Sequence, residues 1–382
     1  MKTKRIITLL FACIVCINVS YAQVTKDAQL LYDQGIKLKD ERKVKEALEK
    51  FKQALLINTN YTEALYQAGW CQNDLQNYNS AIDYLRKTRE IWSTIPKVYF
   101  ELGYAFEKSG NTDSAIKCYN RCLDLKPDYA NAYKQSGYIE YGKENYIDAL
   151  VQFTKYEISA KSQISDYLYW YRKGFTQNAL KDYKAAKISL QKSLTYKADY
   201  INTFVELGLA STKLIQDEEA IGYFNKAIEL DPKSHLPYNG IAEVYRDNKK
   251  EMNEAMTWYK KTLSINPMER KANFGMGYCF NALTKYNEAI DYLKKAIEKE
   301  PAYTAAYVEL GYSYYKLGKD ADAITQFDKA ISQNANNENA RYYTCLLYIR
   351  VKNKAKAQKV LNELKSLSSK YVPELQPLVN AL

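Results

Sequence analysis

The residues that could do chemistry are few in this chain. It has a single histidine, His235, which falls beside a predicted turn at the start of a helix. No Gly-x-x-x-x-Gly-Lys phosphate loop and no His-Glu-x-x-His metal motif occurs. Gly275 and Gly277 fall inside a predicted helix with no strand before it, which argues against a nucleotide-binding loop. We therefore expect no catalytic residue, metal or cofactor, and interpret His235 as a surface residue.

Cysteine is the other reactive residue type. Five cysteines follow the first 22 residues, an odd number that argues against a disulfide framework: Cys71, Cys118, Cys122, Cys279 and Cys345. Cys118 and Cys122 are four residues apart on one predicted helix, where a disulfide would be geometrically awkward. We interpret all five as small buried side chains, with a metal or redox role as the alternative.

Small residues recur along the chain with a fixed spacing. Alanines repeat every 34 residues, with one step of 37 and one of 35, at positions 47, 81, 115, 149, 186, 220, 255, 289, 323 and 357. Eight repeats have a glycine twelve residues earlier, whereas the other two have Ala242 and Cys345 near that position. Four residues after each alanine stands a large apolar side chain, such as Phe51 or Leu85. This pattern predicts antiparallel helix pairs, because small residues let two helices approach and a bulky one fills the gap.

The pattern resembles the tetratricopeptide repeat family, whose unit has 34 residues. The best match is the segment 201–234, in which seven residues are in phase: Phe204, Leu207, Gly208, Ala220, Phe224, Ala227 and Pro232. The resemblance extends from about Ala28 to Tyr371. It implies an all-α fold, a right-handed α-solenoid of about ten helix-turn-helix repeats, and says little about function because the family is defined by packing positions.

Four segments are expected along the chain. Residues 1–22 form a signal peptide, residues 23–163 hold repeats 1–4, residues 164–371 hold repeats 5–10, and residues 372–382 form a capping tail. Three extra residues, Ile164 to Asp166, interrupt the repeat. Because each repeat packs only on its neighbours, we expect a mobile seam near residues 160–170.

The N-terminal segment is typical of a cleaved export signal. Lys2, Lys4 and Arg5 precede an apolar run from Ile6 to Val19, and small residues at 20 and 22 predict cleavage before Gln23. The alternative is a lipoprotein signal ending at Cys13, although Phe11 is bulky for that motif. No second apolar stretch of membrane length follows. These features favour a periplasmic or cell-envelope location.

Aromatic residues stand at the positions that line the concave face in this family. Carrying those phases over gives fourteen residues, which we call the aromatic ladder: Tyr32, Tyr66, Trp70, Phe100, Tyr104, Tyr138, Tyr141, Tyr171, Phe175, Phe274, Tyr278, Tyr312, Tyr315 and Tyr342. Tyrosine joins a large apolar face to a polar tip, so it suits a half-exposed binding surface. The alternative is that these rings pack between repeats.

Charge gives a weaker indication of the ligand. Loss of Lys2, Lys4 and Arg5 lowers the net charge from +11 to +8, spread along the chain without a basic block, so nucleic-acid binding is not expected. Lysines such as Lys134 share the ladder phases and suit a peptide or glycan with acidic groups. Some family members clamp a terminal carboxylate with paired Lys and Asn, but Tyr138 stands where the Asn would be.

Three functions are compatible with the sequence. The first is a non-catalytic adaptor or scaffold that binds a protein or peptide in an aromatic groove at the cell envelope. The second is a module that binds envelope glycan with the same aromatic residues. The third is the recognition subunit of an enzyme complex.

Overall fold

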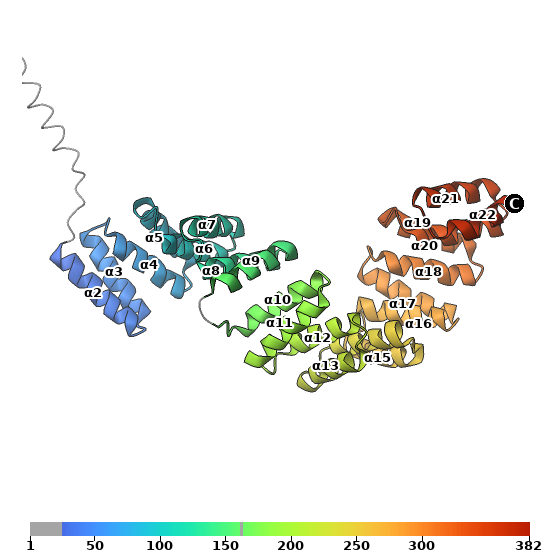
Figure 1. Ribbon diagram of the computed structural model, residues 1–382, viewed down its shortest axis with the longest axis horizontal. Coiled ribbons are helices and arrows are strands. Elements are labelled where there is room, and N and C mark those ends of the chain that lie inside the picture. Colours follow the sequence, from blue (N-terminus) through green and yellow to red (C-terminus); the bar gives the residue numbers. More distant parts are fainter. Residues whose placement is uncertain (1–24, 161–162) are drawn as a thin grey trace, which may run out of the picture. The chain divides into compact units, whose positions relative to one another are not determined.

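The computed structural model describes residues 25–160 and 163–382, and the expected signal peptide lies outside them. The chain divides into two compact units, Met1–Ser165 and Asp166–Leu382. The regular elements of the described residues are all helical, and within each unit each helix packs on the next one along the chain (Figure 1). The all-α solenoid expected from the repeat is confirmed.

The described residues of the first unit form four helix pairs. Their bounds are α2 Lys26–Asp40, α3 Val44–Ile57, α4 Thr62–Asp74, α5 Tyr78–Ile91, α6 Pro96–Lys108, α7 Thr112–Leu125, α8 Ala130–Gly142 and α9 Tyr146–Ser159.

The second unit contains six pairs and a final helix. Their bounds are α10 Tyr167–Ala179, α11 Tyr183–Tyr196, α12 Ile201–Lys213, α13 Asp217–Leu230, α14 Leu236–Glu243 with the π-helix η1 Val244–Lys249, α15 Met252–Ile265, α16 Arg270–Ala282, α17 Tyr286–Lys299, α18 Thr304–Lys316, α19 Asp320–Gln333, α20 Glu338–Arg350, α21 Lys354–Ser366 and α22 Val372–Asn380.

Each helix pair is held together by the small and bulky residues that recur in the sequence. The bulky side chain of the second helix lies directly on the glycine of the first: a Cβ added to Gly103 would be 2.7 Å from Tyr119, and one added to Gly311 would be 2.6 Å from Phe327. Both large side chains are fully buried. The predicted pairing of glycine and bulky residue is therefore confirmed.

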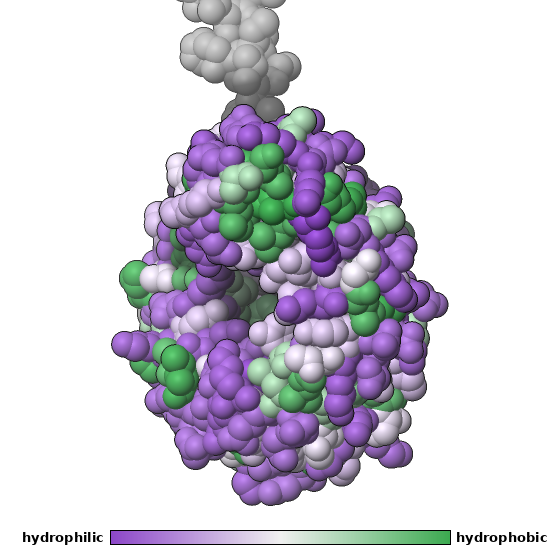
Figure 2. All heavy atoms as spheres, turned by 90° about the vertical axis from the view of Figure 1, so that its right-hand side faces the viewer, coloured by the Kyte–Doolittle hydropathy of each residue, from purple (hydrophilic) through white to green (hydrophobic). Residues whose placement is uncertain are grey.

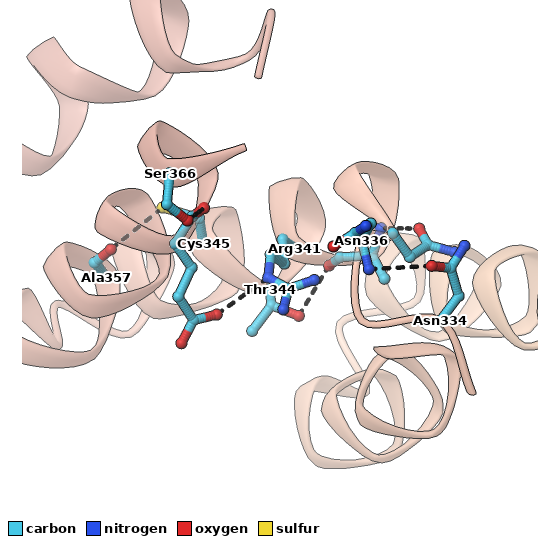
Figure 3. Close-up of polar contacts among 10 residues, drawn as sticks. Asn334, Asn336, Arg341, Thr344, Cys345, Ala357 and Ser366 are labelled. Carbon is cyan, nitrogen blue, oxygen red and sulfur yellow. Dashed lines mark hydrogen bonds and ion pairs between the residues drawn. The ribbon is translucent and has the colours of Figure 1, made fainter. Parts of the chain in front are cut away.

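In repeat ten, a cysteine stands at the position where most other repeats have the glycine. Cys345 of α20 is fully buried and its thiol donates to the carbonyl of Ala357 in α21, with a sulfur–oxygen distance of 3.6 Å (Figure 3). Burial raises the pKa of the thiol to about 11. Cys345 thus acts as a small core residue, as the sequence suggested.

Repeat seven contains the one-residue insertion that lengthens a step of the alanine period to 35 residues. The structure absorbs it as the π-helix Val244–Lys249, which places one more residue in a helical turn. Arg246 lies in this π-helix, bonded through Nε and Nη2 to Asp247 at 2.6 and 2.7 Å. Its guanidinium also lies 5.7 Å from the ring centre of Tyr278.

The residues from 372 form a helix that covers the last repeat. Leu375 and Val379 of α22 are fully buried in one cluster with Leu361 and Leu364 of α21. Figure 2 shows the face at this end of the chain, where hydrophilic residues dominate and hydrophobic ones lie in small separate groups. Within residues 25–160 and 163–382, no helix combines the length and apolar character needed to cross a membrane.

Candidate functional site

Thirteen of the fourteen aromatic ladder residues are half-buried on the first helices of their repeats. The exception is Tyr66, which is only 9% exposed and packs with Trp92, their ring centres 6.3 Å apart. Tyr66 therefore belongs to the core of the first unit. Lys134 is half-buried on α8, beside the ring of Tyr156 at 5.9 Å.

Ladder rings pack against the bulky residues that close each helix pair. Phe100 lies 5.8 Å from Tyr119, and Tyr138 lies 5.9 Å from Phe153, between ring centres. One side of each of these two rings thus covers the core, which accounts for its partial burial. The ladder rings also keep an accessible side, and their role in binding stays a prediction.

Basic side chains at the same repeat positions as the ladder residues lie over aromatic rings. The Lys97 ammonium is 4.5 Å from the ring centre of Tyr66, Lys108 is 5.3 Å from Tyr104, and Arg350 is 4.3 Å from Tyr315. Such cation–π contacts stabilise the ring positions. These cations therefore already have aromatic partners within the chain.

Half-buried carboxyl groups form a second polar feature, which we did not predict. Asn73 donates through Nδ2 to the backbone oxygen and to Oε2 of Glu101 in the next repeat, both at 3.0 Å. The same two bonds join Asn281 to Glu309, at 3.0 and 2.9 Å, and Asn178 to Glu206. Burial raises the pKa of Glu101, Glu206 and Glu309 above the ordinary value, although the Asn bond opposes the shift.

The raised pKa of Glu309 gives a pH-dependent contribution to stability. Since the pKa is higher in the folded chain, folding takes up protons, and this contribution is lost as pH rises through the raised value. We expect Glu309→Gln, which keeps an acceptor for Asn281, to match the wild type in melting temperature near pH 4. Near pH 7 the variant should melt higher, because it removes a buried charge. An equal difference at both pH values, measured by circular dichroism, would contradict this cause.

Two surface pockets combine ladder residues with these Asn–Glu pairs. The pocket of about 320 Å³ in the first unit is lined by Trp70, Asn73, Tyr78, Glu101 and Tyr104, among others. The pocket of about 500 Å³ in the second unit is lined by Tyr278, Asn281, Tyr286, Glu309 and Tyr312, among others. Each residue of the second set stands 208 positions after its counterpart in the first. We call them the repeat-2 pocket and the repeat-8 pocket.

The third Asn–Glu pair has different surroundings. Glu206 lines a pocket of about 210 Å³ together with Val205, Leu209, Leu236 and Lys271. No ladder residue lines it, because repeats six and seven have no aromatic residue in the ladder. Its lining also includes the charged residues Lys213, Glu243 and Glu269.

The remaining reactive residues do not assemble into a site within the part of the chain that the structure describes. No group of three or more His, Cys, Asp or Glu side chains there could hold a metal ion. The five cysteines are free and buried, and burial raises the pKa of Cys118 to about 11 and of Cys122 to about 12. His235 directly precedes α14, and its side chain makes no hydrogen bond to that helix end.

Comparison with known families gives matches in both units. Models described as tetratricopeptide repeat match residues 63–92, 96–129, 167–200, 201–234 and 282–344.

Curated relatives share modest identity. Anaphase-promoting complex subunit 3 of Schizosaccharomyces pombe is 21% identical over 292 residues, which are 67% of this chain and 43% of that protein. A TPR repeat-containing protein of Methanocaldococcus jannaschii is 25% identical over 224 residues, which are 48% of this chain and 39% of the relative. The chain thus spans less than half the length of these curated relatives.

Solved structures with the same architecture extend over most of the chain. A chain of the APC/C hetero-tetramer Cut9–Hcn1 superposes with a TM-score of 0.52 at 13% identity, covering 93% of this chain and 97% of that one. PilW, a type IV pilus biogenesis factor, gives a TM-score of 0.51 at 19% identity and covers 56% of this chain and 99% of its own. At these identities the likeness shows the fold alone.

Proposed function

The chain belongs to the tetratricopeptide repeat family, and from this premise we propose that it is a non-catalytic adaptor or scaffold whose aromatic ladder binds a protein or peptide at the cell envelope. The observation that carries the proposal is the set of half-buried ladder rings on the first helices of repeats one to five and eight to ten. Rings of this kind give large contact areas at little cost in conformational entropy, since they are already fixed by packing.

The cell-envelope part of the proposal depends on the N-terminal segment. Its basic start, apolar run and small residues before Gln23 support export through a cleaved signal. Intact mass of the protein from its host should give a chain that starts at Gln23. A chain that begins at a lipidated Cys13 would support the lipoprotein alternative.

If the ladder binds the partner, removing one of its rings should lower the affinity for that partner. A partner is first identified by crosslinking in envelope fractions and mass spectrometry. We then expect Trp70→Ala, Tyr104→Ala and Tyr278→Ala each to weaken its capture about tenfold, or about 1.4 kcal/mol, because each removes a ring that lines a pocket.

The matched control is Tyr133→Ala. Tyr133 lies on the first helix of repeat four but outside the ladder, where its hydroxyl donates to the carbonyl of Pro127 at 3.1 Å. Capture should be unchanged in this variant. Equal capture by all four variants would reject the ladder as the binding surface, and competition by an envelope glycan would favour the glycan alternative.

A further inference from the structure

We propose that the repeat-2 and repeat-8 pockets each bind the ammonium group of a lysine side chain of the partner. This inference rests on the proposed function, because it specifies the chemistry of the ligand that the ladder takes. It differs from the acidic ligand that the lysines of the ladder phases suggested from sequence. The reason is that the floor of each pocket holds a carboxyl group, contributed by a position outside the ladder.

The two pockets share one construction. In each, the asparagine of one repeat fixes the glutamate of the next, as Asn73 fixes Glu101. A tyrosine pair stands edge to face beside the carboxyl group: the ring centres of Tyr78 and Tyr104 are 6.4 Å apart, with an interplanar angle of 75°. For Tyr286 and Tyr312 the values are 6.1 Å and 80°. The same five-residue arrangement thus occurs once in each unit.

A fixed carboxylate beside aromatic faces suits a cation. The carboxylate supplies the opposite charge. Lys108 already lies over Tyr104 and Lys316 over Tyr312, so the rings of Tyr78 and Tyr286 supply the negative face that attracts an ammonium group. The repeat-2 pocket also has Asp74 in its lining but no lysine or arginine. Burial raises the pKa of Glu101 and of Glu309, and a cation from the partner would oppose this shift by stabilising the charged carboxylate.

The asparagine bond favours lysine over arginine. Oε2 of Glu101 accepts from Asn73, and Oε2 of Glu309 accepts from Asn281. One oxygen of each carboxyl group is therefore already engaged. Arginine prefers to bond both oxygens of a carboxylate through its planar fork, whereas an ammonium group needs a single oxygen.

Nearby lysines of the chain have partners of their own at the repeat-2 pocket. Lys108 pairs with Glu107 at 2.8 Å, and Lys39 donates to Gln67 at 3.0 Å. The repeat-8 pocket differs, since Lys316 lines it and Arg246 lies over Tyr278. We therefore expect the repeat-2 pocket to bind lysine more tightly.

The chain contains a natural control for this arrangement. Around Glu206, Asn178 and Tyr183 keep the roles of Asn73 and Tyr78, but Leu209 replaces the second tyrosine. Lys271 lines this third pocket and lowers the pKa of Glu206 against the effect of burial. Glu206 thus bonds to an asparagine as Glu101 does but lacks the tyrosine pair.

The test uses capped, fluorescein-labelled peptides of twelve residues in which lysine alternates with serine and tyrosine. Binding to the mature chain is measured by fluorescence anisotropy. We expect Glu101→Gln to weaken binding about fivefold and the Glu101→Gln, Glu309→Gln double variant about tenfold or more. Glu206→Gln should change it less than twofold. Glutamine keeps the acceptor for asparagine, so the melting temperature of each variant should not fall.

Four outcomes would overturn the inference. These are no binding of the lysine peptide, equal binding of its acetyl-lysine form, tighter binding of the arginine form, and an equal loss in Glu206→Gln. Capture of the partner found by crosslinking distinguishes a failure of this inference from a failure of the proposed function. Capture that responds to Trp70→Ala but not to Glu101→Gln would keep the adaptor and reject the lysine pocket. Capture that ignores both substitutions would reject the adaptor surface itself.

Discussion

Replacing Phe327 with alanine is expected to lower the free energy of unfolding by about 3–5 kcal/mol. The Phe327 side chain is fully buried in α19, over Gly311 of α18. Its ring also stacks on Tyr343 of the next repeat, with centres 5.6 Å apart and planes 12° from parallel. The substitution would therefore leave a cavity both within a repeat and between two repeats. Urea unfolding followed by circular dichroism gives the difference.

The control for this prediction is Phe327→Leu. Leucine occupies the same phase in other repeats, for example at Leu85 and Leu293, where it is fully buried over a glycine. We expect this variant to lose only about 1 kcal/mol, because leucine fills most of the space. If the alanine variant were as stable as the leucine variant, Phe327 would not be the residue that closes its helix pair.

The packing of this fold could be predicted because the residues that determine it are restricted in type. Only a small residue fits where two helices touch, so Gly103 and Gly311 mark the helix pairs in the sequence. The bulky partner follows at a fixed distance for the same reason. The helix pairs could therefore be located from the sequence alone.

The pockets could not be predicted because their key residues are common in helices. Glutamate occurs throughout the chain, and its residue type alone does not separate Glu101 from an exposed glutamate. Its role depends on Asn73, which lies 28 residues away in the preceding repeat. The available signal was the recurrence of this Asn–Glu spacing at Asn178 and Asn281.

Two local features show where the repeat pattern gives less information. The extra residue of repeat seven was visible, but its absorption into a π-helix depends on backbone hydrogen bonds that no residue type specifies. Tyr66 has a ladder phase, yet Trp92 at the end of α5 covers it. Whether a ladder residue is exposed therefore depends on its neighbour in space.

Replacing Gly208 with alanine is expected to destabilise the chain by about 1–3 kcal/mol. Gly208 is buried in α12, and its added Cβ would lie 2.5 Å from Phe224. Phe224 cannot move aside freely, because a Cβ on Gly240 of the next repeat would lie only 2.3 Å from the same ring. The ring is thus held between two glycines.

The sign of the effect should reverse at Gly222 of α13, in the same repeat. A Cβ there would have no atom within 4 Å, and the residue is exposed. Gly222→Ala should therefore raise stability by about 0.5–1 kcal/mol, which is the usual gain for alanine over glycine inside a helix. Urea unfolding of both variants makes the comparison. If Gly208→Ala stabilised the chain as Gly222→Ala does, the close approach of the paired helices would not require a glycine at this position.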